Sequence, residues 1–179
     1  DQLDAEARLD GPNHRVLRVT VDLALGKGQE VVERISGWLA APDPGDAGHC
    51  DRLRLIAAEA ELSQKRPAEA LAFMEARAPE AASEPSGLAV SMRIARALAA
   101  SDAARAAAVF EKAVRATSSE DPLYRARLLD WLRCSLRVPE LKESALAEAE
   151  AHASMFEGAE CPEKLRTEFA ELLRQNQGP

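Results

Sequence analysis

Apolar and polar residues alternate along most of the chain with the spacing of amphipathic α-helices. Near the C-terminal end, Leu165, Phe169 and either Leu172 or Leu173 recur every three or four residues among polar ones, which places them on one face of a helix. Near the N-terminal end the apolar residues of HRVLRVTVDLAL fit a helix and a strand about equally well. We assign this segment to a helix because the rest of the chain has helical patterning.

Prolines and glycines divide this pattern into separate helices. Pro67, Pro122, Pro139 and Pro162 each precede a run of helix-forming residues, and proline suits the first position of a helix because its missing N–H would be unpaired there. Asp121 is the expected N-cap of the helix that follows it. The expected helices span residues 13–25, 29–41, 51–64, 67–78, 88–100, 103–116, 122–137, 139–156 and 162–175.

The links between the expected helices alternate in length, which predicts helical hairpins. Short links join the members of a pair, and longer loops at 41–50 and 78–87 separate pairs. Short links force neighbouring helices to run antiparallel, and one hairpin cannot bury its apolar faces alone, so hairpins stack. The predicted fold is all-α, with an N-terminal flank at 1–12 for which helix and coil both stay open, about four hairpins at 13–156, and a capping helix with a tail at 157–179.

An alanine recurs at one place in the second helix of successive hairpins. Ala70 aligns with Ala106 at an offset of 36 residues, and an offset of 39 then reaches Ala145. A small residue at a fixed place lets two helices approach closely. We therefore expect Ala106 and Ala113 to lie under a neighbouring helix. High helix propensity alone accounts for the alanines without such counterparts, which are Ala104, Ala107 and Ala108.

One complete motif, A-x3-F-x2-A, is formed by Ala106, Phe110 and Ala113. It is similar to the second helix of the tetratricopeptide repeat, a 34-residue helix–turn–helix unit. Ala70 and Met74 match two of the three positions. The resemblance covers residues 14–156 loosely and 51–116 best. The repeats depart from the family in their spacing of 36–39 residues, in a missing glycine and in a displaced closing proline, and other arrays of helical hairpins remain an alternative.

The resemblance implies a right-handed superhelical array, an α-solenoid, whose first helices line a concave groove. The expected first helices contain ten arginines and five acidic residues, whereas the second helices contain six basic and nine acidic residues. An Arg-enriched groove would favour carboxylates of an acidic peptide or partner protein. The alternative is that arginine stems merely cover helix flanks. The predicted partner-binding residues are Arg54, Arg93, Arg96, Arg127 and Arg133.

Composition and charge argue against several classes of function. The net charge of −7 argues against direct nucleic-acid binding, which needs cationic surfaces. No apolar run approaches the ~20 residues of a membrane-spanning helix, and the acidic N-terminal end differs from a secretory leader. The three cysteines, Cys50, Cys134 and Cys161, do not form a disulfide framework, which indicates the cytoplasm. The alanine-rich composition fits a GC-rich bacterial gene, and the first residue, Asp1, suggests a piece of a longer protein.

No catalytic motif stands out. A phosphate-binding loop and a nucleophile elbow are both absent from the sequence. The adjacent His49 and Cys50 have no second pair at metal-ligand spacing, so they are interpreted as ordinary loop residues.

Two acid pairs at i,i+2 point apart on a helix and are expected in solvent; they are Glu59 with Glu61 and Glu148 with Glu150. His152 is expected to be partly buried and structural, and Cys134 packed and inert. We therefore expect no enzyme activity, cofactor or metal.

The leading hypothesis is a non-catalytic scaffold that binds a peptide or a partner protein. Three alternatives stay open. The array could be the ligand- or inhibitor-sensing domain of a larger transcription regulator or signalling ATPase, or an unrecognised helical enzyme, which would need a pocket with convergent titratable groups. It could also form homo-oligomers through its N-terminal helix and the apolar face of 162–175.

Overall fold

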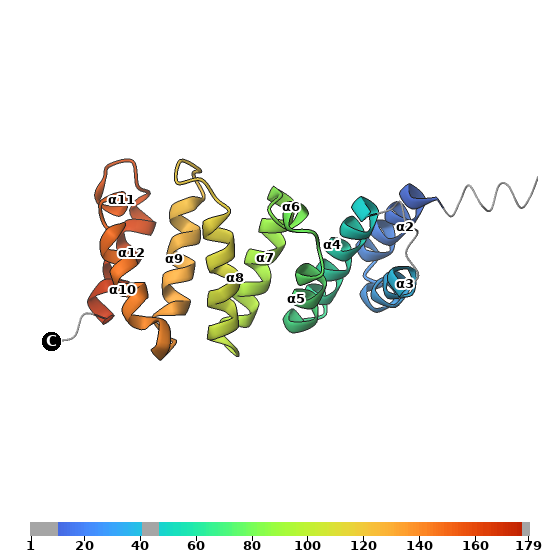
Figure 1. The fold of residues 1–179 in the computed structure, drawn as a ribbon, viewed down its shortest axis with the longest axis horizontal. Coiled ribbons are helices and arrows are strands. Elements are labelled where there is room, and N and C mark those ends of the chain that lie inside the picture. Colours follow the sequence, from blue (N-terminus) through green and yellow to red (C-terminus); the bar gives the residue numbers. More distant parts are fainter. Residues whose placement is uncertain (1–10, 41–46, 177–179) are drawn as a thin grey trace, which may run out of the picture. The chain divides into compact units, whose positions relative to one another are not determined.

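The described part of the chain is entirely helical. A computed structural model describes residues 11–40 and 47–176, and within these ranges it contains eleven α-helices, one 3₁₀-helix and no strand (Figure 1). The expected all-α class is therefore confirmed. Among the described helices, none combines the length and the apolar character that crossing a bilayer requires. Two compact units divide the chain at Val90, within α7 (Pro85–Leu98), and each is described by itself.

The first unit, residues 1–90, is built from two helix pairs and a short connecting helix. Its first four helices, with three-residue links inside each pair, are α2 (Pro12–Ala24), α3 (Gly28–Ala40), α4 (Ala47–Ser63) and α5 (Pro67–Glu75). Helix α2 packs on α3, α4 packs on α5, and α3 packs on α4, so the two pairs stack. Their shared core comprises Val19, Val31, Ile35, Leu53, Ala57 and Ala60.

Both helix pairs of the first unit turn at a residue with a left-handed backbone. Gly26 has φ +80° and Lys65 has φ +60°. In each turn the following residue donates its N–H to a carbonyl five residues earlier, Lys27 to Asp22 and Arg66 to Glu61, both at 3.0 Å. This is the Schellman arrangement, in which glycine is usual because it has no Cβ. The two turns lie 39 residues apart, which agrees with the repeat spacing expected from the alanines.

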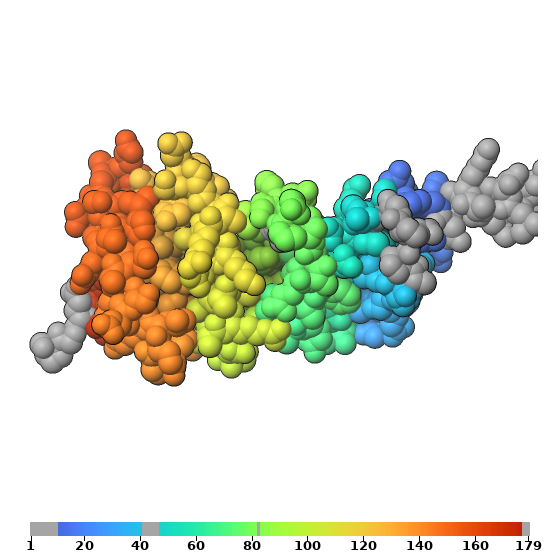
Figure 2. All heavy atoms as spheres, in the orientation of Figure 1, coloured from blue at the N-terminus to red at the C-terminus, as the bar shows by residue number. Residues whose placement is uncertain are grey.

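The second unit, residues 91–179, contains the end of α7 and the remaining helices. These are α8 (Ala103–Arg115), α9 (Tyr124–Ser135), the 3₁₀-helix η1 (Pro139–Leu141), α10 (Lys142–Ala151), α11 (Ser154–Glu157) and α12 (Glu163–Asn176). Helix α9 packs against α8, α10 and α12, and the side chains of this part form one continuous surface (yellow to red in Figure 2). In its core the rings of Phe156 and Phe169 stack with centroids 4.1 Å apart.

The alanine-rich segment has the buried face that its pattern predicts. Ala106 and Ala113 are 0% and 1% exposed, and Ala104 and Ala108 are exposed. The interpretation of Ala107 is wrong, because this residue is also fully buried. Helix propensity alone therefore does not account for Ala107, whose side chain is as fully buried as that of Ala106.

Two expected loops are partly helical. Helix α4 begins at Ala47, so His49 and Cys50 lie in its first turn rather than in a loop, and residues 41–46 lie outside the described residues. The loop expected at 78–87 contains the short helix α6 (Pro79–Ala82), which starts with proline at its first position, and it also contains the start of α7.

The longest expected helix, 139–156, is broken into three. Pro139 begins the 3₁₀-helix η1, α10 ends at Ala151 with His152 as its C-cap, and α11 follows after Ala153. The break turns Phe156 into the core against Phe169, a burial that outweighs one lost helical turn. Asp121 is not the N-cap of α9, because that helix begins at Tyr124 after Leu123. Its carboxylate instead accepts the N–H of Leu123 at 2.8 Å, within the preceding turn.

Candidate binding sites

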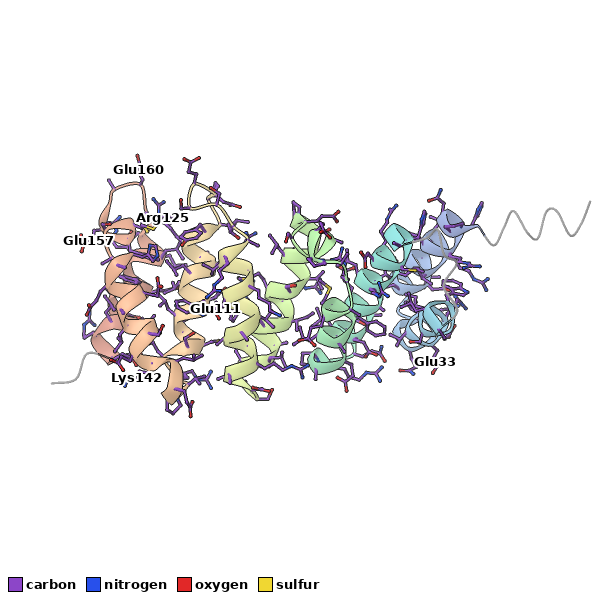
Figure 3. The ribbon with its side chains drawn as sticks, viewed as in Figure 1. Glu33, Glu111, Arg125, Lys142, Glu157 and Glu160 are labelled. Carbon is purple, nitrogen blue, oxygen red and sulfur yellow. The ribbon has the colours of Figure 1, made fainter. Side chains whose placement is uncertain are left out.

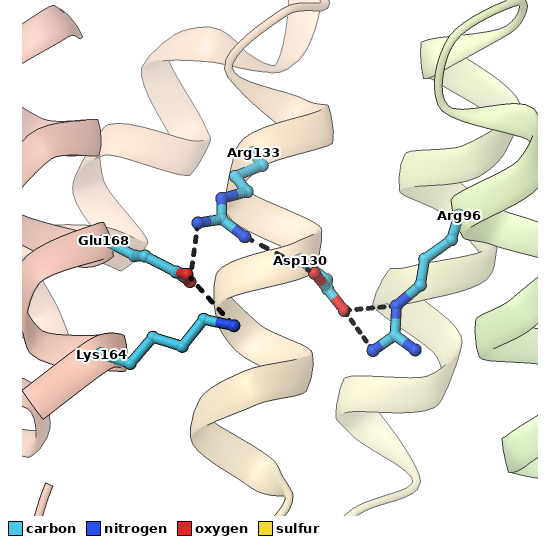
Figure 4. Close-up of polar contacts among 5 residues, drawn as sticks. All are labelled: Arg96, Asp130, Arg133, Lys164 and Glu168. Carbon is cyan, nitrogen blue, oxygen red and sulfur yellow. Dashed lines mark hydrogen bonds and ion pairs between the residues drawn. The ribbon is translucent and has the colours of Figure 1, made fainter. Parts of the chain in front are cut away.

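Five charged side chains form a row across α7, α9 and α12 in the second unit (Figure 4). Arg96 donates to Asp130 Oδ2 from Nε at 3.0 Å and from Nη2 at 2.7 Å. Arg133, which lies on α9 with Asp130, donates to Oε2 of Glu168 on α12 at 2.8 Å. The other terminal nitrogen of Arg133 lies 3.9 Å from Asp130. Lys164 Nζ lies 3.9 Å from Glu168. We call these five residues the charged row.

Helical spacing brings the charged row together. Asp130 and Arg133 are three residues apart on α9, and Lys164 and Glu168 are four apart on α12, so each pair occupies one helix face. The side chains of Arg96 and Arg133 remain 57% and 41% exposed. Both arginines are thus open to solvent although each is paired with an acid of a neighbouring helix. With three cations and two acids, the row has a net positive charge.

The other three predicted arginines lie in different surroundings. Arg127 is buried, donates to Thr117 Oγ1 and lies 3.7 Å from Asp121, so its contacts favour a structural role. Arg54 is in the first unit, where it donates to the buried Asp51 at 3.0 Å. Arg93 is exposed on α7 and also has an interaction partner. Of the five predicted arginines, Arg96 and Arg133 are the two in the charged row.

A pocket of about 400 Å³ lies between α8, α9 and α10 in the second unit. Each helix contributes one face, because the lining residues recur every three or four positions. The faces are Glu111, Val114 and Arg115 of α8, then Tyr124, Leu128 and Trp131 of α9, and finally Ser144, Glu148 and His152 of α10 and its C-cap. We call this the α8–α10 pocket; its volume lies within the range of small-molecule sites.

Most charges in the α8–α10 pocket are paired. Glu111, labelled in Figure 3, forms an ion pair with Arg115 one turn along α8. His152 Nε2 lies 3.5 Å from Glu148, and its ring meets that of Tyr124 edge to face with centroids 6.2 Å apart. Among the described residues, neither lysine nor arginine lies within ion-pair distance of Glu148.

Sequence reasoning missed the α8–α10 pocket. It correctly expected His152 to be partly buried, since this side chain is 30% exposed. The available signal was the placement of rare aromatic residues: the chain has one tyrosine and two tryptophans, and Tyr124 and Trp131 lie seven residues apart on one face of α9. That signal places the rings together, but it does not show that two other helices leave a cavity over them.

Two buried titratable groups have raised pKa values. Burial raises the pKa of the Glu61 carboxyl; Arg66, whose Nε lies 2.8 Å away, acts in the opposite direction, and Glu69 raises it further. The expectation that Glu61 is in solvent is therefore wrong, because it is only 4% exposed. Burial likewise raises the pKa of the Cys134 thiol, which agrees with a packed and unreactive cysteine.

Other features offer less chemistry. A second hollow, of about 300 Å³ and mostly apolar, lies in the first unit among Leu39, Arg54 and Phe73. The described residues contain no cluster of three or more potential metal ligands, and the three cysteines are free and buried. The apolar face of α12 packs within its own unit through Phe169.

Comparisons with protein-family models, with curated proteins and with solved structures find no match to this chain.

Proposed function

We propose that the chain is a non-catalytic interaction scaffold that binds an acidic segment of a peptide or partner protein, in the cytoplasm, as a tetratricopeptide-like array. The observation that carries this proposal is the charged row, with Arg96 and Arg133 exposed on neighbouring helices. The row is locally cationic on a chain whose net charge is −7, so it is a distinct target for carboxylates.

The existing ion pairs of the row do not prevent such binding. The side chains of Asp130 and Glu168 are only 19% and 26% exposed, so these acids stay paired with the row's arginines. Each guanidinium group has five N–H donors, and a ligand carboxylate can bind the donors on the exposed side that Asp130 and Glu168 leave free. Guanidinium groups bind carboxylates in two parallel hydrogen bonds, and two such groups on adjacent helices can hold successive acidic residues of one peptide.

The test is fluorescence anisotropy with a labelled peptide of alternating glutamate and glycine. We expect saturable binding that weakens as salt is added and is lost in the variant Arg96→Glu/Arg133→Glu. The matched control is Lys112→Glu/Lys142→Glu, which changes the net charge equally on exposed positions of α8 and α10 (Lys142 is labelled in Figure 3). A peptide of alternating glutamine and glycine controls for binding to the backbone.

Thermal unfolding of the same variants separates binding from folding. We expect the Arg96→Glu/Arg133→Glu variant to remain folded and to unfold slightly below the wild-type temperature, because the two arginine side chains are 57% and 41% exposed but the new glutamates repel Asp130 and Glu168. Equal loss of binding in the two double variants would reduce the interaction to net charge, and unchanged binding in the arginine variant would refute the proposal.

A second candidate function, a ligand-sensing regulatory domain, is favoured by the α8–α10 pocket. Its volume of about 400 Å³ and its mixture of apolar and polar lining are typical of small-molecule sites. In that case occupancy of the pocket would alter how α8, α9 and α10 pack, and thereby the unit's affinity for a partner. Ligand-induced stabilisation of the second unit is the measurement that would support it.

A further inference from the structure

We propose that the α8–α10 pocket is a binding site for an organic cation, an ammonium or guanidinium group carried on a short aliphatic stem. The inference goes beyond the scaffold function, and it does not depend on the charged row, because the two sites use different side chains.

The apolar part of the pocket suits an aliphatic stem. Leu128, which is 1% exposed, lines the pocket together with Val114 and Trp131, both partly buried against the same core. Contact with these side chains would remove a methylene stem from water, which is worth about 0.8 kcal/mol per buried CH₂. An inorganic ion would gain nothing from this part of the pocket.

The charge of the pocket favours a cation at its rim. Glu111 and Glu148 both line the pocket, and Arg115 is the lining residue with a permanent positive charge. With histidine neutral, the formal charge of the lining is therefore −1. Arg115 is paired with Glu111 on its own helix, whereas among the described residues the ion-pair neighbour of Glu148 is His152, at 3.5 Å. Glu148 is the carboxylate that an incoming ammonium or guanidinium group would meet.

The aromatic rings and hydroxyl groups of the pocket also attract a cation. A cation is attracted to the face of a tryptophan or tyrosine ring within about 6 Å of its centre, and Trp131 and Tyr124 both line the pocket. The hydroxyl groups of Tyr124 and Ser144 make no hydrogen bond to other described residues, so both can accept one from an N–H donor. A carboxylate ligand would instead face two glutamates and one arginine already in use.

The experiment follows the indole N–H signal of Trp131 in ¹H–¹⁵N correlation spectra of the full chain. The chain has two tryptophans, so the Trp38→Phe variant assigns the signals, and Trp38, partly buried against the core of the first unit, is an internal control. The probes are agmatine and 1-aminopentane, with pentanol as the neutral control and pentanoate as the anionic control. A peptide with one central arginine among glycines and serines presents the same group on a protein.

We expect agmatine and 1-aminopentane to shift the Trp131 signal saturably while the Trp38 signal stays in place. Replacing the pocket carboxylate by Glu148→Gln should weaken this binding about fivefold or more, because a charge-assisted contact worth at least ~1 kcal/mol is lost. The matched control is Glu150→Gln, an exposed acid two residues along α10 that is outside the lining, and it should bind as the wild type does.

The possible outcomes distinguish the two sources of the cation and include the results that would overturn the proposal. Tighter binding of the arginine peptide than of agmatine indicates a partner's side chain as the occupant, and the reverse order indicates a free amine; either result supports the cation site. Saturable binding of pentanoate but not of the amines would overturn the proposal. So would equal weakening by Glu148→Gln and Glu150→Gln, or a Trp131 signal that no amine moves.

Discussion

Replacing Ala106 by leucine tests whether the recurring alanine marks a close helix contact. Ala106 is 0% exposed in α8, which packs on α9, so the three added carbon atoms have no free space to occupy. Forcing extra methylenes into a packed core costs about 1–3 kcal/mol. The control is Ala104→Leu in the same helical turn. This position is exposed, and leucine is nearly as good a helix former as alanine, so the change should stay within about 0.5 kcal/mol.

Urea unfolding followed by far-ultraviolet circular dichroism measures both free energies. Thermal unfolding gives an independent reading, since 1 kcal/mol shifts the melting temperature of a cooperative unit of this size by about 4–8 °C. The spectra of the folded variants should be identical, because both substitutions preserve the helix.

Equal effects at the two positions would refute the reasoning. If both variants are destabilised alike, the helix and not its packing is sensitive. If neither is, then the space around Ala106 yields to a larger side chain and the alanine does not set the approach of α8 to its neighbour.

Three further predictions concern turns, charge and the core. Lys65→Gly should raise the free energy of unfolding by up to about 1 kcal/mol in urea titrations, because Lys65 has φ +60° and glycine has no Cβ penalty there; Gly26→Ala in the matching turn should lower it, and effects of the same sign would contradict the turn geometry. Burial raises the pKa of Glu61 above that of an ordinary glutamate side chain, so the folded state binds more protons than the unfolded state, and stability due to this group falls as pH rises through the folded pKa. The stability of Glu61→Gln relative to wild type should therefore be greatest near neutral pH and shrink as the solution is made acidic, and a difference that grows on acidification would show the opposite shift. Phe169→Ala removes a ring that is 4% exposed and stacked on Phe156, and should cost about 3–5 kcal/mol; a loss below about 1 kcal/mol would mean that α12 is not held by this contact.

Local signals predicted the helices well where a residue acts on its own backbone. Pro67 begins α5 as predicted, because the fixed φ of proline acts without tertiary contacts. The predictions failed where burial decided the outcome. The segment 139–156 has strong helix formers throughout, yet the chain breaks so that Phe156 can reach Phe169.

The sites were harder to predict than the helices. A count of arginines does not show which acids lie opposite, so Arg96, which meets Asp130 across two helices, and Arg127, which is buried beside Thr117, received the same interpretation. The α8–α10 pocket depends on the space left between three helices, and that space follows from packing. Only the shared helix face of Tyr124 and Trp131 is visible in the sequence.

The most direct test of the scaffold proposal is to map the acidic peptide on the protein by ¹H–¹⁵N correlation spectroscopy. The account predicts that the glutamate–glycine peptide shifts backbone amides near Arg96, Asp130, Arg133 and Glu168, together with the Nε–H signals of Arg96 and Arg133, and leaves the Trp131 indole signal unchanged. Shifts spread over all exposed lysines and arginines, or confined to helices outside the charged row, would contradict it.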